Sequence, residues 1–139
     1  MEVEIMALCD AATESGGKLN ILGAFDRINA RQFPAVHSHC AVTVRMRFDR
    51  NEEGQHQVRL NFVDADGKSV MPPLEGKIGI KFPGNVHSVC ANMILNMNRI
   101  KFDQEGQYAI DLTVDGRHEK SLPVNVIYIP GKKGNEGKQ

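Results

Sequence analysis

Two short segments carry imidazole and thiol groups at close spacing, and these groups are suited to binding a metal. They are His37-Ser38-His39-Cys40 and His87-Ser88-Val89-Cys90. Imidazole nitrogen and thiolate sulfur are preferred protein ligands of zinc and copper. Strand alternation sends His37 and His39 to the opposite face from Cys40, so the two histidines would need a third ligand from a neighbouring strand. We keep His37 and His39 as candidate metal ligands, but we expect surface histidines and no cofactor.

A second group of residues has the chemistry to bind anions. Its members occupy polar positions in alternating segments, and they are Arg45, Arg47, Arg59, Lys77 and Lys81. If the strands that carry them are neighbours, they form a basic stripe, in which arginine can hold a phosphate or carboxylate through two parallel hydrogen bonds. The alternative is a solvated sheet face whose charges keep the protein in solution. Both interpretations stay open.

The recognised catalytic motifs are absent from this sequence. It contains no G-x-S-x-G elbow, no phosphate-binding G-x-x-x-x-G-K-[ST] and no H-E-x-x-H. Asp64-Ala65-Asp66-Gly67 matches the start of a calcium loop but lacks the later oxygen ligands and the final glutamate of an EF-hand, so we interpret it as a hairpin turn. We expect no enzymatic activity, and we keep as an alternative an enzyme whose site is assembled from distant strands.

Composition excludes several classes of protein. The 139 residues include 17 basic and 17 acidic side chains, so the net charge is zero and gives no long-range attraction to nucleic acid or to an anionic membrane. No segment approaches the ~20 apolar residues of a membrane span, and the N-terminal residues lack the basic flank of a signal peptide. Three widely spaced cysteines favour reduced thiols over a disulfide framework. We therefore expect a cytoplasmic protein.

The clearest two-residue alternation spans residues 40–67. Apolar and polar side chains alternate over residues 40–49 and again over residues 57–62, which predicts two strands with one buried face each. The intervening loop is rich in Asn, Glu and Gly. This pattern predicts an antiparallel hairpin whose apolar faces point the same way, with Arg45, Arg47 and Arg59 on its shared polar face.

Similar alternation predicts six further strands, at residues 2–10, 19–25, 74–82, 86–98, 108–114 and 122–128. The Met and Asn residues of 86–98 are also compatible with a helix, and residues 26–36 have no regular pattern. Asp115-Gly116 predicts a tight hairpin turn. Pro123 lacks a donor and predicts an edge position or a bulge. Gly106-Gln107-Tyr108 resembles the tyrosine corner of Greek-key sandwiches, in which the phenol bonds to the backbone.

Three segments near the N-terminus resemble a known family. They are Cys9-Asp10-Ala11, the run from Gly17 to Gly23 (G-K-L-N-I-L-G) and the run from Phe33 to His37 (F-P-A-V-H). They are similar to a family of small bacterial proteins catalogued only as a domain of unknown function, and the likeness covers the whole chain. The resemblance implies an immunoglobulin-like β-sandwich and supplies no catalytic residues.

Together these patterns predict an all-β fold, a two-sheet antiparallel immunoglobulin-like sandwich of about eight strands. We expect residues 1–130 to form this single domain and residues 131–139 to form a flexible basic tail. The expected function is a non-enzymatic module that binds another protein through a sheet face or a free strand edge. The alternatives are an enzyme with an unrecognised site, or a binder of a small anionic ligand, such as a sugar phosphate, a nucleotide or an acidic glycan.

The cysteines provide a direct test of the predicted faces. Cys9 and Cys40 alternate with apolar residues, whereas Cys90 shares a face with serine and asparagine side chains. In the native protein Cys90 is expected to react first with a thiol reagent, and Cys9 and Cys40 are expected to react only on unfolding. Mass spectrometry after timed labelling measures this order. Equal labelling of the three thiols in the folded protein would show that the predicted faces are wrong.

Overall fold

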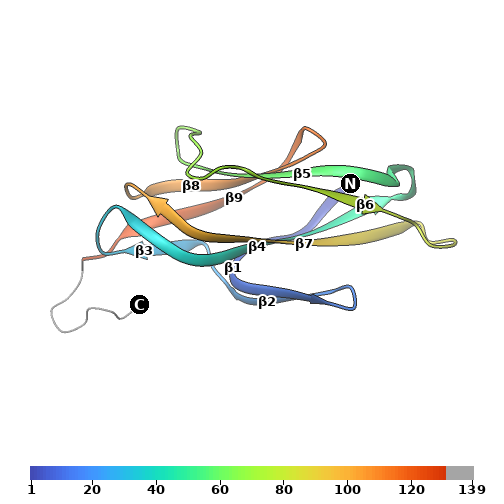
Figure 1. Cartoon of the computed structure of the whole chain (residues 1–139), viewed down its shortest axis with the longest axis horizontal. Coiled ribbons are helices and arrows are strands. Elements are labelled where there is room, and N and C mark those ends of the chain that lie inside the picture. The colour runs from blue at the N-terminus through green and yellow to red at the C-terminus, as the bar shows by residue number, and fades with distance from the viewer. Residues whose placement is uncertain (131–139) are drawn as a thin grey trace.

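Alternating apolar and polar side chains form nine β-strands within residues 1–130, the part of the chain that the computed structural model describes (Figure 1). The strands are β1 (Glu2–Ser15), β2 (Lys18–Ala24), β3 (Arg27–Ala30), β4 (Ala35–Asp49), β5 (Gly54–Val63), β6 (Leu74–Ile80), β7 (Ser88–Phe102), β8 (Gly106–Val114) and β9 (Arg117–Tyr128), and one 3-10 turn, η1 (Arg50–Glu52), joins β4 to β5. The tail predicted at residues 131–139 lies outside the described residues. Residues 1–130 include no helix long and apolar enough to cross a membrane.

The strands form two sheets that pack face to face. One sheet has the order β2-β1-β4-β7 and the other the order β3-β9-β8-β5-β6. The prediction of an all-β fold with two sheets is confirmed. The immunoglobulin-like arrangement is not confirmed, because the four-stranded sheet is curled like half of a barrel, with β2 folded away from the layer of β4 and β7 (Figure 1).

The core between the sheets is built around one face of β4. Val42, Val44, Met46 and Phe48 are fully buried and form a continuous cluster with apolar residues of β5, β8 and β9. Burying a side chain of this size stabilises a fold by roughly 1.5–3 kcal/mol. The predicted alternation of β4 is therefore confirmed as the central row of the core.

An aromatic group closes one end of this core. The rings of Phe62, Phe102 and Tyr108 meet edge to face, with centroids 5.0 Å apart for the Phe102–Tyr108 pair. Tyr108 Oη donates a hydrogen bond of 2.6 Å to the carbonyl oxygen of Gln104, four residues upstream. The backbone bond predicted for a tyrosine corner is thus confirmed.

The predicted hairpin of residues 40–62 is wrong, although both of its strands are present. β4 pairs with β1 and β7, whereas β5 pairs with β6 and β8, so the two strands lie in different sheets. The 3-10 turn η1 carries the chain across the core from one sheet to the other. Two alternating strands with a loop between them fit this crossing as well as they fit a hairpin, because in both cases each strand buries one face.

The hairpin of β1 and β2 folds over the outer face of its own sheet. A bulge between Val3 and Ile5 shifts the register of β1 against β4. The core-facing residues of β1 are therefore Met6 and Leu8, and Cys9, which alternates with apolar residues in the sequence, lies on the opposite face. The tip of the hairpin reaches β7, where Asn92 Nδ2 donates to the carbonyl oxygen of Gly17 at 3.1 Å.

Beneath this hairpin the outer face of the sheet is also dry. Cys9, Ala41 and Thr43 are fully buried there, outside the main core cluster. Cys40 is fully buried inside the core, where burial raises the pKa of its thiol to about 11, and Cys90 is partly exposed. The predicted order of burial is confirmed, and the labelling rates stay a prediction.

Residues 26–36 contain a short strand that their irregular sequence did not reveal. β3 pairs with β9 in parallel, from Arg27 with Asn125 to Ala30 with Tyr128. The five-stranded sheet is therefore mixed, and the prediction of a wholly antiparallel fold is wrong. Pro123 lies two residues before this pairing begins and pairs only with Ala109 of β8. At Pro123 the β3 side of β9 therefore has no neighbouring strand, and the missing N–H costs no ladder hydrogen bond there.

The remaining predictions of local structure are confirmed. Residues 88–102 form a strand, not a helix. Asp115 and Gly116 both adopt positive φ, 53° and 78°, in the tight turn between β8 and β9. Asp64 begins a turn in which its Oδ1 accepts hydrogen bonds from the backbone of Asp66 and Lys68, both at 2.9 Å.

A partly buried imidazole, that of His56, ties the crossing turn to the hairpin of β8 and β9. His56 Nδ1 lies 2.6 Å from Asp115 Oδ2, and His56 Nε2 bonds to the carbonyl oxygen of Glu52. Both partners are acceptors, so this geometry favours the protonated imidazole, in which both ring nitrogens donate. The bond to Asp115 raises the pKa of His56, and the same bond lowers the pKa of Asp115.

This pair makes stability depend on pH. Because the folded pKa of His56 is raised, its contribution is complete below the ordinary histidine pKa and is lost as pH rises through the folded value. Asp115→Asn keeps an acceptor for the Gln57 amide and tolerates positive φ. It is expected to lower the free energy of unfolding by about 1 kcal/mol near pH 6, a small value because Asp115 is half exposed, and by less near pH 9.

Urea unfolding across this pH range measures the effect. His87→Gln is the matched control, since it removes an exposed imidazole that makes no hydrogen bond or ion pair within residues 1–130. An identical pH profile for Asp115→Asn and the unchanged protein would contradict the assignment of His56 as a charged, stabilising group.

Candidate functional site

Arg45 and Arg47 lie side by side on the outer face of β4, as predicted, but both already form ion pairs with a carboxylate of the same chain. Glu4 of β1 accepts a hydrogen bond from Arg45 Nε at 3.2 Å and from Arg47 Nε at 2.6 Å. Arg45 Nη1 also donates to Asn92 Oδ1 at 3.0 Å, and Arg47 Nη1 donates to Ser88 Oγ at 2.9 Å. These two arginines therefore brace β1, β4 and β7 together.

The protonation of this group follows from its contacts. The bond from Arg47 holds the pKa of Glu4 below its ordinary value, and the same bond raises the pKa of Arg47. Cys90 donates to Glu4 Oε1 at 3.3 Å. Burial, followed by this bond, raises the pKa of the Cys90 thiol. The carboxylate is thus committed to ionic and hydrogen-bonded contacts, and the thiol is held in its neutral form.

The other three predicted basic residues belong to the opposite sheet. Arg59 lies on β5, where it pairs in register with Glu75, and Lys77 lies on β6 opposite Gln57. Lys81 follows the end of β6. The five residues therefore do not form one stripe, because the chain changes sheets between Arg47 and Arg59.

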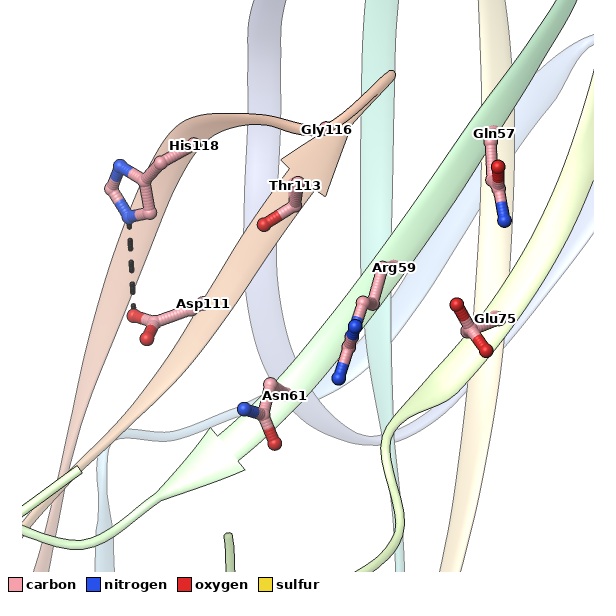
Figure 2. Close-up of a pocket in the computed structure, with 8 residues that line it drawn as sticks. All are labelled: Gln57, Arg59, Asn61, Glu75, Asp111, Thr113, Gly116 and His118. Atoms are coloured by element: carbon pink, nitrogen blue, oxygen red, sulfur yellow. Dashed lines mark ion pairs between the residues drawn. The ribbon is translucent and has the colours of Figure 1, made fainter. Parts of the chain in front are cut away.

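Arg59 lies in a polar hollow on the outer face of the five-stranded sheet (Figure 2). The hollow has a volume of about 450 Å³, and its lining comes from four strands and the turn between β8 and β9: Gln57, Arg59, Asn61, Glu75, Asp111, Thr113, Gly116 and His118. Within residues 1–130 the guanidinium of Arg59 makes no hydrogen bond or ion pair. Arg59 is accordingly the one arginine of the predicted three whose guanidinium is available to a ligand.

The charges in this hollow do not favour an anion. Two carboxylates, Glu75 and Asp111, line it together with Arg59 (Figure 2). A phosphate bound to Arg59 would meet negative charge within the same hollow, which opposes binding. The arrangement suits polar groups of either sign and does not reproduce the basic stripe predicted from the sequence.

One edge of the hollow brings together the residue types of a hydrolytic triad. Ser121 Oγ donates to Asp111 Oδ1, and His118 Nε2 lies 2.8 Å from Ser121 Oγ. In a triad the imidazole stands between carboxylate and hydroxyl and takes the hydroxyl proton. Here Ser121 Oγ donates its hydrogen bond to Asp111 rather than to the imidazole, and His118 Nε2 itself lies 3.9 Å from Asp111 Oδ1 (Figure 2). This order does not activate the hydroxyl as a nucleophile.

The predicted histidines lie in separate environments on β4. His37 packs against the ring of Phe25, with centroids 5.7 Å apart, and His39 Nδ1 donates to Asn98 Oδ1 at 2.8 Å. Within the described part of the chain, no three His, Cys, Asp or Glu side chains gather as a metal would require. His37 does line a second hollow, of about 540 Å³, together with Asp10 and Arg27.

The sheet edges offer a different kind of site, and β7 is the longest of the four edge strands. β7 is 15 residues long and bonds to β4 along one side only. No backbone bond joins its other side to any part of residues 1–130. From Ser88 to Asn98 it carries no charged side chain. Charged residues and short length are the usual protections of an edge strand, and this stretch has neither.

A seam of half-buried apolar side chains runs beside this edge. The edge strand of the other sheet, β6, lies across from β7, and the sheets approach closely where Met93 Cε comes within 3.6 Å of the ideal Cβ position at Gly76. Partly buried residues pack against the core from both strands, and they are Leu74, Ile78, Val89, Ala91, Met93 and Leu95. Within residues 1–130, β6 and β7 thus form an open side of the sandwich.

Sequence reasoning missed this site although part of its signal was visible. The absence of charge over residues 88–98 stands out in a chain with 34 charged residues. An uncharged strand is equally typical of a sheet interior, however, and strand order alone places β7 at an edge.

Comparison with known proteins identifies the family and supplies no activity. No curated protein matches the chain. The predicted resemblance to a family of unknown function is confirmed, since a family model, DUF6941, matches residues 4–127. This match covers nearly all of the strands described above, and the protein therefore belongs to the family of unknown function DUF6941.

Proposed function

We propose that this protein is a non-enzymatic interaction module that binds an extended polypeptide segment along the free edge of β7. The observation that carries the proposal is a 15-residue strand, bonded on one side only and uncharged from Ser88 to Asn98. An added strand gains main-chain hydrogen bonds from such an edge. Its alternate side chains would extend the half-buried seam formed by β6 and β7.

The surroundings of β7 support its use as a rigid template. Its neighbour β4 is buried on both faces near Val42 and Thr43. The first half of β7 is held in place by hydrogen bonds that join Arg45, Arg47 and Glu4 to Asn92, Ser88 and Cys90. A preorganised edge lowers the entropy that binding must overcome. Free thiols at all three cysteines fit a reducing compartment, so we place this module in the cytoplasm.

Peptide selection tests the proposal directly. Peptides chosen from a random library on sparsely immobilised protein are expected to bind with micromolar affinity and to slow amide exchange within residues 88–98, because their backbone bonds to β7. Asn96→Lys, an exposed change on this edge, is expected to weaken them about tenfold. Gln107→Lys, an exposed change on the interior strand β8, is the matched control. Peptides that protect only other strands would overturn the proposal.

The anionic-ligand alternative has its own test at Arg59. Because Glu75 and Asp111 share its hollow, sugar phosphates, nucleotides and acidic glycans are expected to leave the melting temperature unchanged. A stabilised melting curve that Arg59→Gln abolishes, and that Arg45→Gln does not, would favour an anion site in this hollow over the edge of β7.

A further inference from the structure

We propose that the strand bound at the edge of β7 is β7 of a second copy of this chain, in an antiparallel pair that closes a two-fold symmetric dimer. This inference rests on the proposed function and names its partner. It follows from the sequences of β7 and β6. Each of these strands is suited to lie antiparallel to its own copy, and the two pairs can share one two-fold axis.

β7 is balanced about Met93. The uncharged stretch of 11 residues, Ser88 to Asn98, has five residues on each side of Met93. In an antiparallel pair centred there, Ala91 lies opposite the partner's Leu95 and Asn92 lies opposite the partner's Ile94. Opposed residues then share a face of the sheet, as pairing requires. No charge meets a like charge along this stretch, and apolar side chains oppose apolar ones on the core face.

β6 is balanced about Gly76 in a complementary way. Glu75 and Lys77 flank this glycine on the outer face, and Leu74 and Ile78 flank it on the core face. About a two-fold axis at Gly76, Glu75 faces the partner's Lys77 and Lys77 faces the partner's Glu75. Leu74 meets the partner's Ile78. Self-association therefore sets opposite charges together and covers apolar surface at once.

One axis satisfies both strands. Met93 Cε lies 3.6 Å from the ideal Cβ position at Gly76, so the midpoint of the uncharged run in β7 lies against the midpoint of the charge pattern in β6. A two-fold axis perpendicular to the sheets at Met93 therefore passes close to Gly76. The agreement between the two layers is the observation that selects a second copy over an unrelated peptide.

The other edges of the two sheets are less suited to this pairing. β3 is four residues long and begins at Arg27, and β2 begins at Lys18 and is drawn into the curled hairpin. Pairing through β7 would join the four strands of each copy into one continuous sheet of eight. The contact is isologous, so it uses both free β7 edges and closes at two copies.

Sedimentation of the full chain over a range of concentrations tests the dimer. A monomer–dimer equilibrium is expected, with a dissociation constant on the order of 10 µM. Amides of residues 88–98 are expected to exchange more slowly as concentration rises. Asn96→Lys is expected to raise the dissociation constant about tenfold, and the control Gln107→Lys is expected to leave it unchanged.

Charge reversal on β6 tests the second layer. Glu75→Lys sets two lysines against each other across the axis, and Lys77→Glu does the same with two glutamates, so each is expected to raise the dissociation constant about tenfold. The double change, Glu75→Lys with Lys77→Glu, restores opposite charges and is expected to recover dimerisation to within about threefold. A merely structural role for these residues would not give this rescue. Melting curves confirm that each variant is folded.

The outcomes separate this inference from the proposed function. A chain that stays monomeric while selected peptides still protect residues 88–98 would overturn the dimer and leave the strand-binding function standing. A monomer with no peptide binding at this edge would overturn both. A dimer that ignores the changes at Glu75, Lys77 and Asn96, or a species larger than a dimer, would overturn the two-fold contact through β7.

Discussion

The fold depends on burying both faces of β4. Its inner face supplies Met46 and Phe48 to the core, and its outer face is dry at Ala41 and Thr43 because the hairpin of β1 and β2 folds over it. A strand that is buried on both faces needs neighbours on both edges, and β1 and β7 fill those places. The curl of the four-stranded sheet and the position of β7 at its far edge both follow from this single requirement.

The sequence reveals strands well and their partners poorly. Alternation identifies each strand by the side chains that it buries, and this information is local, as Phe48 and Tyr108 show. Partners are set by the path of the chain, and here the turn η1 moves it to the other sheet between Asp49 and Gly54. The strand β3 escaped notice because its alternation, with Ile28 and Ala30 buried and Arg27 exposed, covers only four residues and is too short to distinguish from a loop.

The predicted arginine stripe failed for a related reason. Arg45 and Arg47 have the chemistry of an anion site, but the anion is Glu4, which lies 41 residues before Arg45 and meets it only through the pairing of β1 with β4. Arg59 would have completed the stripe in a hairpin, and the change of sheet moves it away. Charge in a sequence thus indicates an available ligand only after the strand order shows which opposite charges lie beside it.

An unprotected edge needs a physical explanation. Fifteen residues of regular strand with free backbone groups would favour uncontrolled association, which natural sheets usually prevent with lysine, proline or a bulge. The stretch from Ser88 to Asn98 contains neither lysine nor proline. It has no bulge either, because its pairing with β4 keeps one register throughout. The positive φ of Arg99 marks the point where charge returns to the strand. The edge from Ser88 to Asn98 thus lacks the usual protections against strand pairing and lies beside an apolar seam. The simplest explanation is that a bound strand covers this edge.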